Sequence, residues 1–412
     1  MMGSTAPPQP SNAFELASQI GYEFFGEIGK TAFEEFELSF ASKLHFRFVD
    51  LPDFRVWQNL NLYWDKSYLK NTLIEKFSKC LPDNFAIKVT SATAETMFGS
   101  TTPNGKKLIE PVFYKKEFCL MPELMSFLGV GESMRTKIPV FNEVLEGSLT
   151  TRTLLKFGEA DESLVSLYQN GVGRLYFDGK TLSYYPQTCF IVGTRPLENN
   201  VFTYLDKSGF WSRFHTVQFR IDDTAARDYF TGSMKTFDES DIRVLKTMNE
   251  DLLKCRSGSI SRPSDDLLLP ILQRAYETAE KLTTKFPDLD LKDVVNNRIK
   301  GDVIREISAY RILVPYASDS DVQKWAMERI PHFLDFTANP IIAEDFTART
   351  GRTSDECLTV LRELFKGEHT RKKILEVMMN QEGFKRDVVD RTLKKFSRLG
   401  QGIYKIGGFT EY

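Results

Sequence analysis

Short apolar, β-rich runs alternate with helical runs between residues 46 and 221 of the chain. The strand-like runs are FAIKVTSA at 85–92, EFCLMPEL at 117–124, RLYF at 174–177, TCFIVGT at 188–194 and HTVQFRI at 215–221. The segment SYLKNTLIEKFSKCL at 67–81 has the three- and four-residue apolar spacing of an amphipathic helix. Strands that alternate with helices predict an α/β fold, in which a mostly parallel sheet is covered by helices on both faces.

Helical spacing dominates on either side of this region. The segment 13–42 predicts helices with an acidic outer face, and three later helices, at 265–282, 296–313 and 321–336, are enough for a small bundle. Another helix is expected at 354–365. The last residues predict two helices followed by a hairpin around Gly407 and Gly408, an order that suits a winged helix.

These patterns divide the chain into seven parts. We expect a disordered tail (1–12), an N-terminal helical segment (13–55), an α/β core (56–225), a polar linker (226–264), a helical bundle that would form a lid (265–338), a connecting helix (339–366) and a winged-helix domain (367–412).

Composition narrows the class of protein. The 412 residues are 42% hydrophobic and carry a net charge of −2, so a nucleic-acid surface would require local clusters of Lys and Arg. The five cysteines are scattered and form no C-x-x-C pair, which argues against a disulfide framework and a zinc site. No apolar run approaches a membrane span, and the N-terminus is polar and Pro-rich. We expect a cytoplasmic protein without a membrane partner.

The stretch LNLYWDKSYLKNTLIEKF at 60–77 contains the first candidate site. Phosphate-binding loops follow the pattern G-x-x-x-x-G-K-[ST], in which Lys reaches the outer phosphates and Ser or Thr holds Mg²⁺. Aligning Lys66 and Ser67 with the last two positions places Leu60 and Asp65 where the glycines belong. Asp65, Lys66 and Ser67 are therefore candidates for binding a nucleotide, and Ser67 for Mg²⁺. The alternative is an exposed helix N-terminus with Asp65 near the N-cap.

A second candidate is the Ser-Arg-Phe sequence at 212–214, within SGFWSRFHTVQF. It resembles the arginine-finger motif of the minichromosome maintenance (MCM) family of AAA+ ring helicases. In that family the arginine reaches the γ-phosphate bound by the neighbouring subunit, and Arg213 matches it. The alternative is a surface salt bridge before a strand.

The MCM resemblance implies roles for further residues. Glu123 follows an apolar strand as the catalytic Glu of the Walker B motif does, although Pro122 stands at the position of the preceding Asp. Thr194 and Arg195 follow another strand, where the family carries its sensor-1 Asn. Arg298 matches the sensor-2 arginine. Each strand can also be interpreted as a buried strand leaving a sheet, and Arg298 as a charge on a helix face.

Three basic segments are candidates for binding DNA under the same resemblance. The hairpin expected within 97–114 carries Lys106 and Lys107 at its tip, and the one within 173–186 carries Lys180 beside an Asp-Gly turn. In MCM helicases the second hairpin reaches the DNA backbone in the central channel. The basic C-terminal segment could lie along phosphates through Lys385, Arg386, Lys394 and Lys395. Exposed hairpin tips and solvated helix faces also carry lysines.

The resemblance covers roughly 56–412 and implies an AAA+ P-loop-type parallel sheet flanked by helices, an all-α lid and a C-terminal winged helix. It implies an ATP- and Mg²⁺-dependent DNA helicase of replication that forms a homo-oligomeric ring such as a hexamer, works with other replication proteins and suits a mobile genetic element. MCM proteins usually carry a large N-terminal domain; with roughly 55 residues before the core, we expect a reduced form that lacks this domain.

Two other functions stay open on the sequence. The chain could be an AAA+ relative that binds DNA without hydrolysing ATP, as an initiator, loader or regulator, because the loop glycines and the Walker B Asp are absent. An unrelated hydrolase has little support, since neither H-E-x-x-H nor G-x-S-x-G occurs.

Overall fold

A computed structural model describes residues 12–406, apart from 46, 52–54, 65–68, 91–97, 102–107, 110, 112–115, 130–131, 149, 154–174, 178–180, 198, 220–237, 257, 286–290, 335–353, 366, 381–385, 395 and 401. The chain forms two compact units, divided between Ala338 and Asn339, with the short segment Glu198–Val201 grouped with the second.

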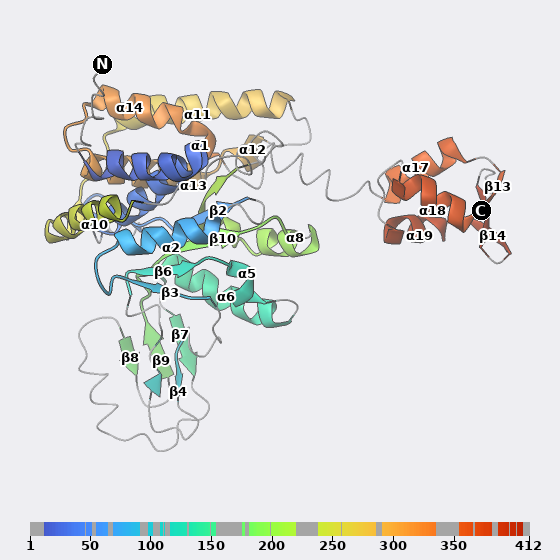
Figure 1. Ribbon diagram of the computed structural model, residues 1–412, viewed down its shortest axis with the longest axis horizontal. Helices are drawn as coiled ribbons and strands as arrows, with labels where there is room; N and C mark the ends of the chain where they lie inside the picture. Colours follow the sequence, from blue (N-terminus) through green and yellow to red (C-terminus); the bar gives the residue numbers. More distant parts are fainter. Residues whose placement is uncertain are drawn as a thin grey trace, which may run out of the picture. The chain divides into compact units, whose positions relative to one another are not determined.

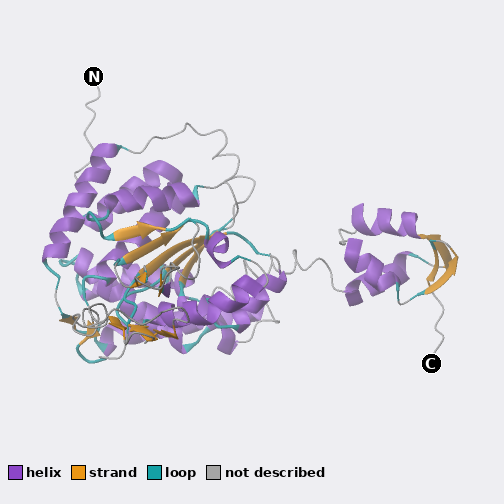
Figure 2. Cartoon of the chain, turned by 90° about the horizontal axis from the view of Figure 1, so that it is seen from below, coloured by secondary structure: helices purple, strands orange, loops and turns teal. Residues whose placement is uncertain are grey.

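The first unit is built on a five-stranded parallel sheet (Figures 1 and 2). Its strands are β2 (Leu60–Tyr63), β3 (Ala86–Lys88), β6 (Phe118–Met121), β10 (Cys189–Thr194) and β11 (His215–Gln218), in the spatial order β11-β2-β10-β6-β3. All four pairings are parallel. The α/β prediction is confirmed, and the arrangement is compatible with a P-loop-like fold.

Both faces of the sheet are covered by helices, as the apolar strands require (Figure 2). On one face, alternate residues such as Leu60, Leu62 and Ile191 share a buried core with α1 (Ala13–Ser42) and α2 (Lys70–Cys80). The other face packs against α5 (Leu124–Leu128) and α6 (Glu132–Glu146), where the rings of Phe141 and Phe190 are 5.1 Å apart.

Helix α1 has the predicted acidic outer face only in its first half, where Glu15, Glu23 and Glu27 are exposed. Glu34, Glu35 and Glu37 are all buried, because α1 is surrounded by α2, α10 (Glu239–Lys254) and α13 (Asn297–Leu313). The helix is broken at Phe25 and Gly26, whose backbone angles are not helical. The prediction is therefore wrong for the second half of α1, whose charged face is buried.

The helical bundle predicted after residue 264 is present, but the segment predicted as a polar linker contains a helix. Helix α10 occupies part of 226–264 and buries Ile242 and Leu245 against the core. The three expected helices correspond to α11 (Asp265–Lys285), α13 and α14 (Asp319–Glu328). Two short helices, α12 (Leu291–Val294) and α15 (Ile330–Phe333), complete this bundle, whose buried residues form their own core.

The two expected hairpins of the first unit are present. β4 (Ser100–Thr101) pairs antiparallel with β5 (Leu108–Ile109), and β8 (Leu175–Phe177) with β9 (Thr181–Tyr184), which also pairs with β7 (Thr150–Thr153). The remaining elements are β1 (Arg47–Phe48) paired with β12 (Ser259–Ile260), helix α8 (Asn199–Lys207) and the 3₁₀ turn η1 (Trp211–Arg213).

The described residues of the second unit form three helices and a three-stranded antiparallel sheet. In chain order these are α17 (Ser354–Leu364), β13 (Gly367–Thr370), α18 (Arg371–Asn380), α19 (Arg386–Leu393), β14 (Ser397–Gly400) and β15 (Ile403–Ile406), and the strand order is β13-β15-β14. The hairpin lies before Gly407 and Gly408 rather than around them. It turns at Gly402, whose φ of 77° favours glycine.

Candidate functional site

The order of the sheet strands creates a topological switch point at one edge. After β2 the chain crosses β10 and β6 to reach β3, the outermost strand on one side of the sheet. After β10 it crosses β2 in the opposite direction to reach β11, the outermost strand on the other side. Right-handed crossovers in opposite directions lie on opposite faces, so the carboxyl ends of β2 and β10 border a topological switch point. Ligands of open α/β sheets bind at such points. The loop between β2 and α2 begins there.

Lys70, the first residue of α2, lies against this loop. Its side chain is buried, and Nζ donates a hydrogen bond to the carbonyl oxygen of Trp64 at 2.5 Å. Nζ also lies 5.2 Å from the centre of the Trp64 ring. The lysine side chain thus reaches from the helix N-terminus back to Trp64, which follows β2.

The residue before Lys70 has an uncommon backbone conformation. Leu69, the N-cap of α2, has φ 57° and ψ 4° and makes no side-chain capping hydrogen bond. A left-handed conformation costs a non-glycine residue about 1–2 kcal/mol. Phosphate-binding loops have a glycine directly before their lysine, and this glycine allows the same left-handed backbone conformation. Leu69 stands directly before Lys70 in the same way.

The residues predicted from the loop pattern, Asp65, Lys66 and Ser67, lie outside the described part of the chain. Leu60, however, is a buried β2 residue rather than the first residue of a loop. Aligned with 64–71 instead, the same eight-residue pattern ends at Lys70 and Asn71, in the first turn of α2, and only its lysine is matched. Sequence reasoning missed Lys70 because it did not recognise β2 as a strand.

Three other predicted residues lie at the same edge. Glu123 is exposed and lies two residues after the end of β6, beside the end of β10. Thr194 ends β10, but its hydroxyl donates to Asn61 Oδ1 at 2.5 Å and is directed into the sheet. Arg195 follows it and is half-buried. The carboxyl edge therefore combines the β2–α2 loop and Lys70 with a carboxylate and an arginine.

Arg213 lies at the opposite, amino edge of the sheet, just before β11. Its Nη2 forms an ion pair with Glu146 Oε1 at 2.5 Å, and its Nη1 donates to the carbonyl oxygen of Gly209. Within one chain the structure does not bring Arg213 to Glu123 or to the β2–α2 loop.

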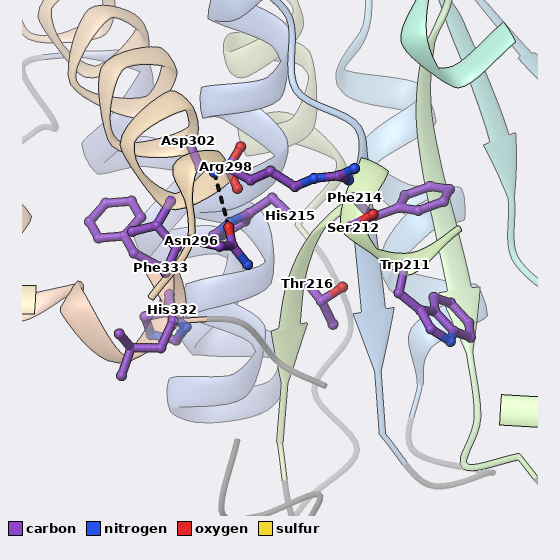
Figure 3. A pocket seen from close by; sticks show the side chains of 12 residues that line it. Trp211, Ser212, Phe214, His215, Thr216, Asn296, Arg298, Asp302, His332 and Phe333 are labelled. Atoms are coloured by element: carbon purple, nitrogen blue, oxygen red, sulfur yellow. Dashed lines mark hydrogen bonds between the residues drawn. The ribbon is translucent and has the colours of Figure 1, made fainter. Parts of the chain in front are cut away.

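Arg298 lies near this amino edge too, in the first turn of α13. It lines a small pocket of about 30 Å³ with Ser212 and Phe214, the neighbours of Arg213. Figure 3 shows the Arg298 side chain extending toward Ser212 and Phe214. The second arginine of this helix, Arg305, instead pairs with Asp302 at 2.8 Å and donates to the Arg55 carbonyl.

A buried ionic cluster lies behind the pocket, and no motif in the sequence predicts it. His215 Nε2 is 3.4 Å from Glu35 Oε1 and 3.1 Å from Glu306 Oε1. Arg329 forms ion pairs with Glu34, Glu35 and Glu306. The cluster joins α1, β11 and α13 to the segment before α15.

Burial and charge act against each other in this cluster. Burial alone would lower the pKa of His215, but the carboxylates of Glu306 and Glu35 raise it to about 9. Burial raises the pKa of Glu306, with Glu35 adding to the rise. Burial would also raise the pKa of Glu35, but Arg329 and His215 hold it below its usual range. At neutral pH His215 is therefore a cation inside the protein.

The donor atoms of Glu35, His215 and Glu306 lie within 4.8 Å of one another, close enough to hold a metal ion. Arg329, however, already forms ion pairs with both carboxylates. A bound cation would have to displace this buried guanidinium, so the residues fit an ionic cluster and not a metal centre.

The predicted DNA-binding residues are only partly described. Lys106, Lys107, Lys180, Lys385 and Lys395 lie outside the described residues. Arg386 begins α19, and Lys394 is exposed just after that helix. Within the described residues, no helix combines the length and apolar character needed to cross a membrane.

Comparison with protein-family models finds no match, and comparison with curated protein sequences finds none either.

Proposed function

We propose that this chain binds a nucleoside triphosphate at the carboxyl edge of its sheet and acts on DNA as an MCM-like AAA+ ATPase. In this proposal the phosphates lie against the β2–α2 loop, and the arginines that complete the site come from a neighbouring copy. ATP with Mg²⁺ is the ligand we expect.

The observation that carries the proposal is the geometry of Lys70. A buried lysine at a helix N-terminus reaches back to the carbonyl oxygen of Trp64, at a switch point of the sheet. The N-terminal amides of α2 have no side-chain cap from Leu69, and such amides favour an anion. A phosphate at this position would replace the Trp64 carbonyl as the partner of Nζ. The strained backbone of Leu69 is consistent with a loop shaped for a ligand.

The remaining residues of the edge suit roles around the phosphates. Glu123 is a candidate to orient and polarise the attacking water. Mg²⁺ would help neutralise the phosphate charge, with Ser67 or Asn71 as its protein ligand. Pro122 cannot supply the carboxylate that usually orders this ion.

The position of the arginines favours a ring. Arg213 and Arg298 lie by the amino edge, away from the β2–α2 loop of the same chain. Each copy would therefore present these arginines to the nucleotide of its neighbour, which is how a ring shares its active sites. The second unit, through α19 and its hairpin, would contact DNA as a winged helix.

Nucleotide affinity of single lysine variants tests the proposal. A fluorescent ATP analogue with Mg²⁺ is titrated into the full chain and into Lys70→Ala, Lys66→Ala and Lys79→Ala. Lys79 is an exposed lysine near the end of α2 and serves as the matched control. Loss of the Lys70 ammonium should weaken binding about 10- to 100-fold, the equivalent of about 1.5–3 kcal/mol for a charge-assisted hydrogen bond. Equal affinity of the Lys70 and Lys79 variants would refute this site.

A second candidate function is DNA binding without ATP hydrolysis, as an initiator, loader or regulator. Trp64, Leu69 and Pro122 favour it, because they replace the two glycines and the Asp of an active site. ATP turnover with and without single-stranded DNA separates the two functions. DNA-stimulated turnover that Lys70→Ala abolishes supports the ATPase, whereas DNA binding without turnover supports the second candidate.

A further inference from the structure

Arg213 is held within its own chain by the end of helix α6. Glu146, the last residue of α6, accepts the ion pair from Nη2 at 2.5 Å, and Gly209 accepts a hydrogen bond from Nη1. Only 16% of the Arg213 side chain is exposed, against 45% for Glu146. The guanidinium therefore points toward the protein while its carboxylate partner faces solvent.

The backbone on both sides of this ion pair is fixed by one buried amide. Asn59 Nδ2 donates to the carbonyl oxygens of Leu145 and Arg213, at 3.1 and 3.2 Å. Its main-chain oxygen also accepts from His215 at 2.8 Å. The end of α6 and the turn that carries Arg213 are thus held together, and the side chains are the parts that can move.

The charge of Glu146 is poorly suited to its position on the helix. A carboxylate in the last turn of a helix faces the negative end of the helix dipole, where cations are favoured. The Arg213 guanidinium compensates this charge. A competing anion that approached from solvent would meet the exposed side of the same ion pair.

We propose that Glu146 is a positioning residue that restrains Arg213 in the isolated chain, and that Arg213 binds the nucleotide of a second copy by exchanging the Glu146 carboxylate for a phosphate. The inference rests on the proposed function, since the second copy supplies the phosphate. Glu146 then opposes the association of two copies. Association requires a bound nucleotide, whose phosphate replaces the Glu146 carboxylate as the partner of Arg213.

Nucleotide-dependent self-association of the full chain tests this role. Sedimentation velocity is measured with Mg²⁺ and a non-hydrolysable ATP analogue for the unaltered chain, Glu146→Gln and Glu146→Asp. An exchange of this partly exposed ion pair contributes modestly, so Glu146→Gln should lower the protein concentration at half-association about fivefold. Glu146→Asp keeps the charge and should associate like the unaltered chain.

A double substitution separates restraint from a structural effect. In an Arg213→Gln background, Glu146→Gln should leave the association midpoint unchanged, because no guanidinium remains to be released. A fivefold shift in that background would overturn the inference, and so would unchanged or weaker association of Glu146→Gln alone. Neither result would affect the proposed nucleotide binding. Absence of nucleotide binding by the unaltered chain would overturn the proposed function together with the inference.

Discussion

Glu37 offers the sharpest test of the packing of α1. The side chain is fully buried, and Asn249 Nδ2 donates to its Oε1 at 3.1 Å. Its Oε2 has no hydrogen-bond partner among the described residues. Burial raises the pKa of Glu37 to about 8, despite the hydrogen bond from Asn249. We predict that Glu37→Gln stabilises the first unit at neutral pH.

The sign and size follow from proton binding. Between the ordinary pKa of 4.5 and the folded value of about 8, the folded chain keeps a proton on Glu37 that the unfolded chain has lost. The contribution of Glu37 to stability is therefore complete below pH 4.5 and declines as pH rises toward 8. At pH 7 the decline is on the order of 3 kcal/mol, from about 1.4 kcal/mol per pKa unit. Gln has the same shape and no such decline.

Urea unfolding followed by tryptophan fluorescence measures this difference, since all four tryptophans precede residue 339. The free energy of unfolding of Glu37→Gln minus that of the unaltered chain should be near zero at pH 4.5 and should rise steadily to pH 8. Glu280→Gln, at an exposed position on α11, controls for the loss of a negative charge. A difference that stays flat with pH, or that falls, would refute the burial of an uncompensated carboxyl group.

Three further predictions concern other parts of the structure. Arg329→Met leaves the buried carboxylates of its cluster without their guanidinium and should lower the free energy of unfolding by about 3–5 kcal/mol, measured by the same urea titration. Gly193→Ala would place a Cβ against the Pro122 carbonyl oxygen and should cost about 1–3 kcal/mol, whereas Gly258→Ala enters open space and should be neutral. Lys394→Glu should weaken binding of a DNA duplex and flatten its salt dependence, and unchanged affinity would exclude this surface.

The sequence predicted most of the sheet because its strands are short apolar runs. The runs that form β3, β6, β10 and β11 were each recognised, and so were the two hairpins of the first unit, the bundle helices and α17. These elements follow local pattern, since strands buried on both faces are apolar throughout. The alternation with helices then fixed the parallel class.

Strand β2 and the polar contacts could not be predicted in the same way. β2 contains Asn61, whose amide is satisfied by Thr194 and Thr216 on neighbouring strands, so its sequence does not have the continuous apolar character of a buried strand. The burial of Glu35 and Glu37 depends on partners far along the chain, such as His215 and Asn249. A single sequence does not show which distant residues will meet.

The central claim is that the β2–α2 loop and Lys70 bind phosphate. A crystal structure of the full chain with Mg²⁺ and a non-hydrolysable ATP analogue tests it most directly. The account predicts phosphate oxygens at the N-terminus of α2, within hydrogen-bond distance of Lys70 Nζ, with the bond from Nζ to the Trp64 carbonyl broken. A nucleotide bound elsewhere would contradict the account. So would a structure at saturating ligand in which Lys70 Nζ still donates to the Trp64 carbonyl oxygen.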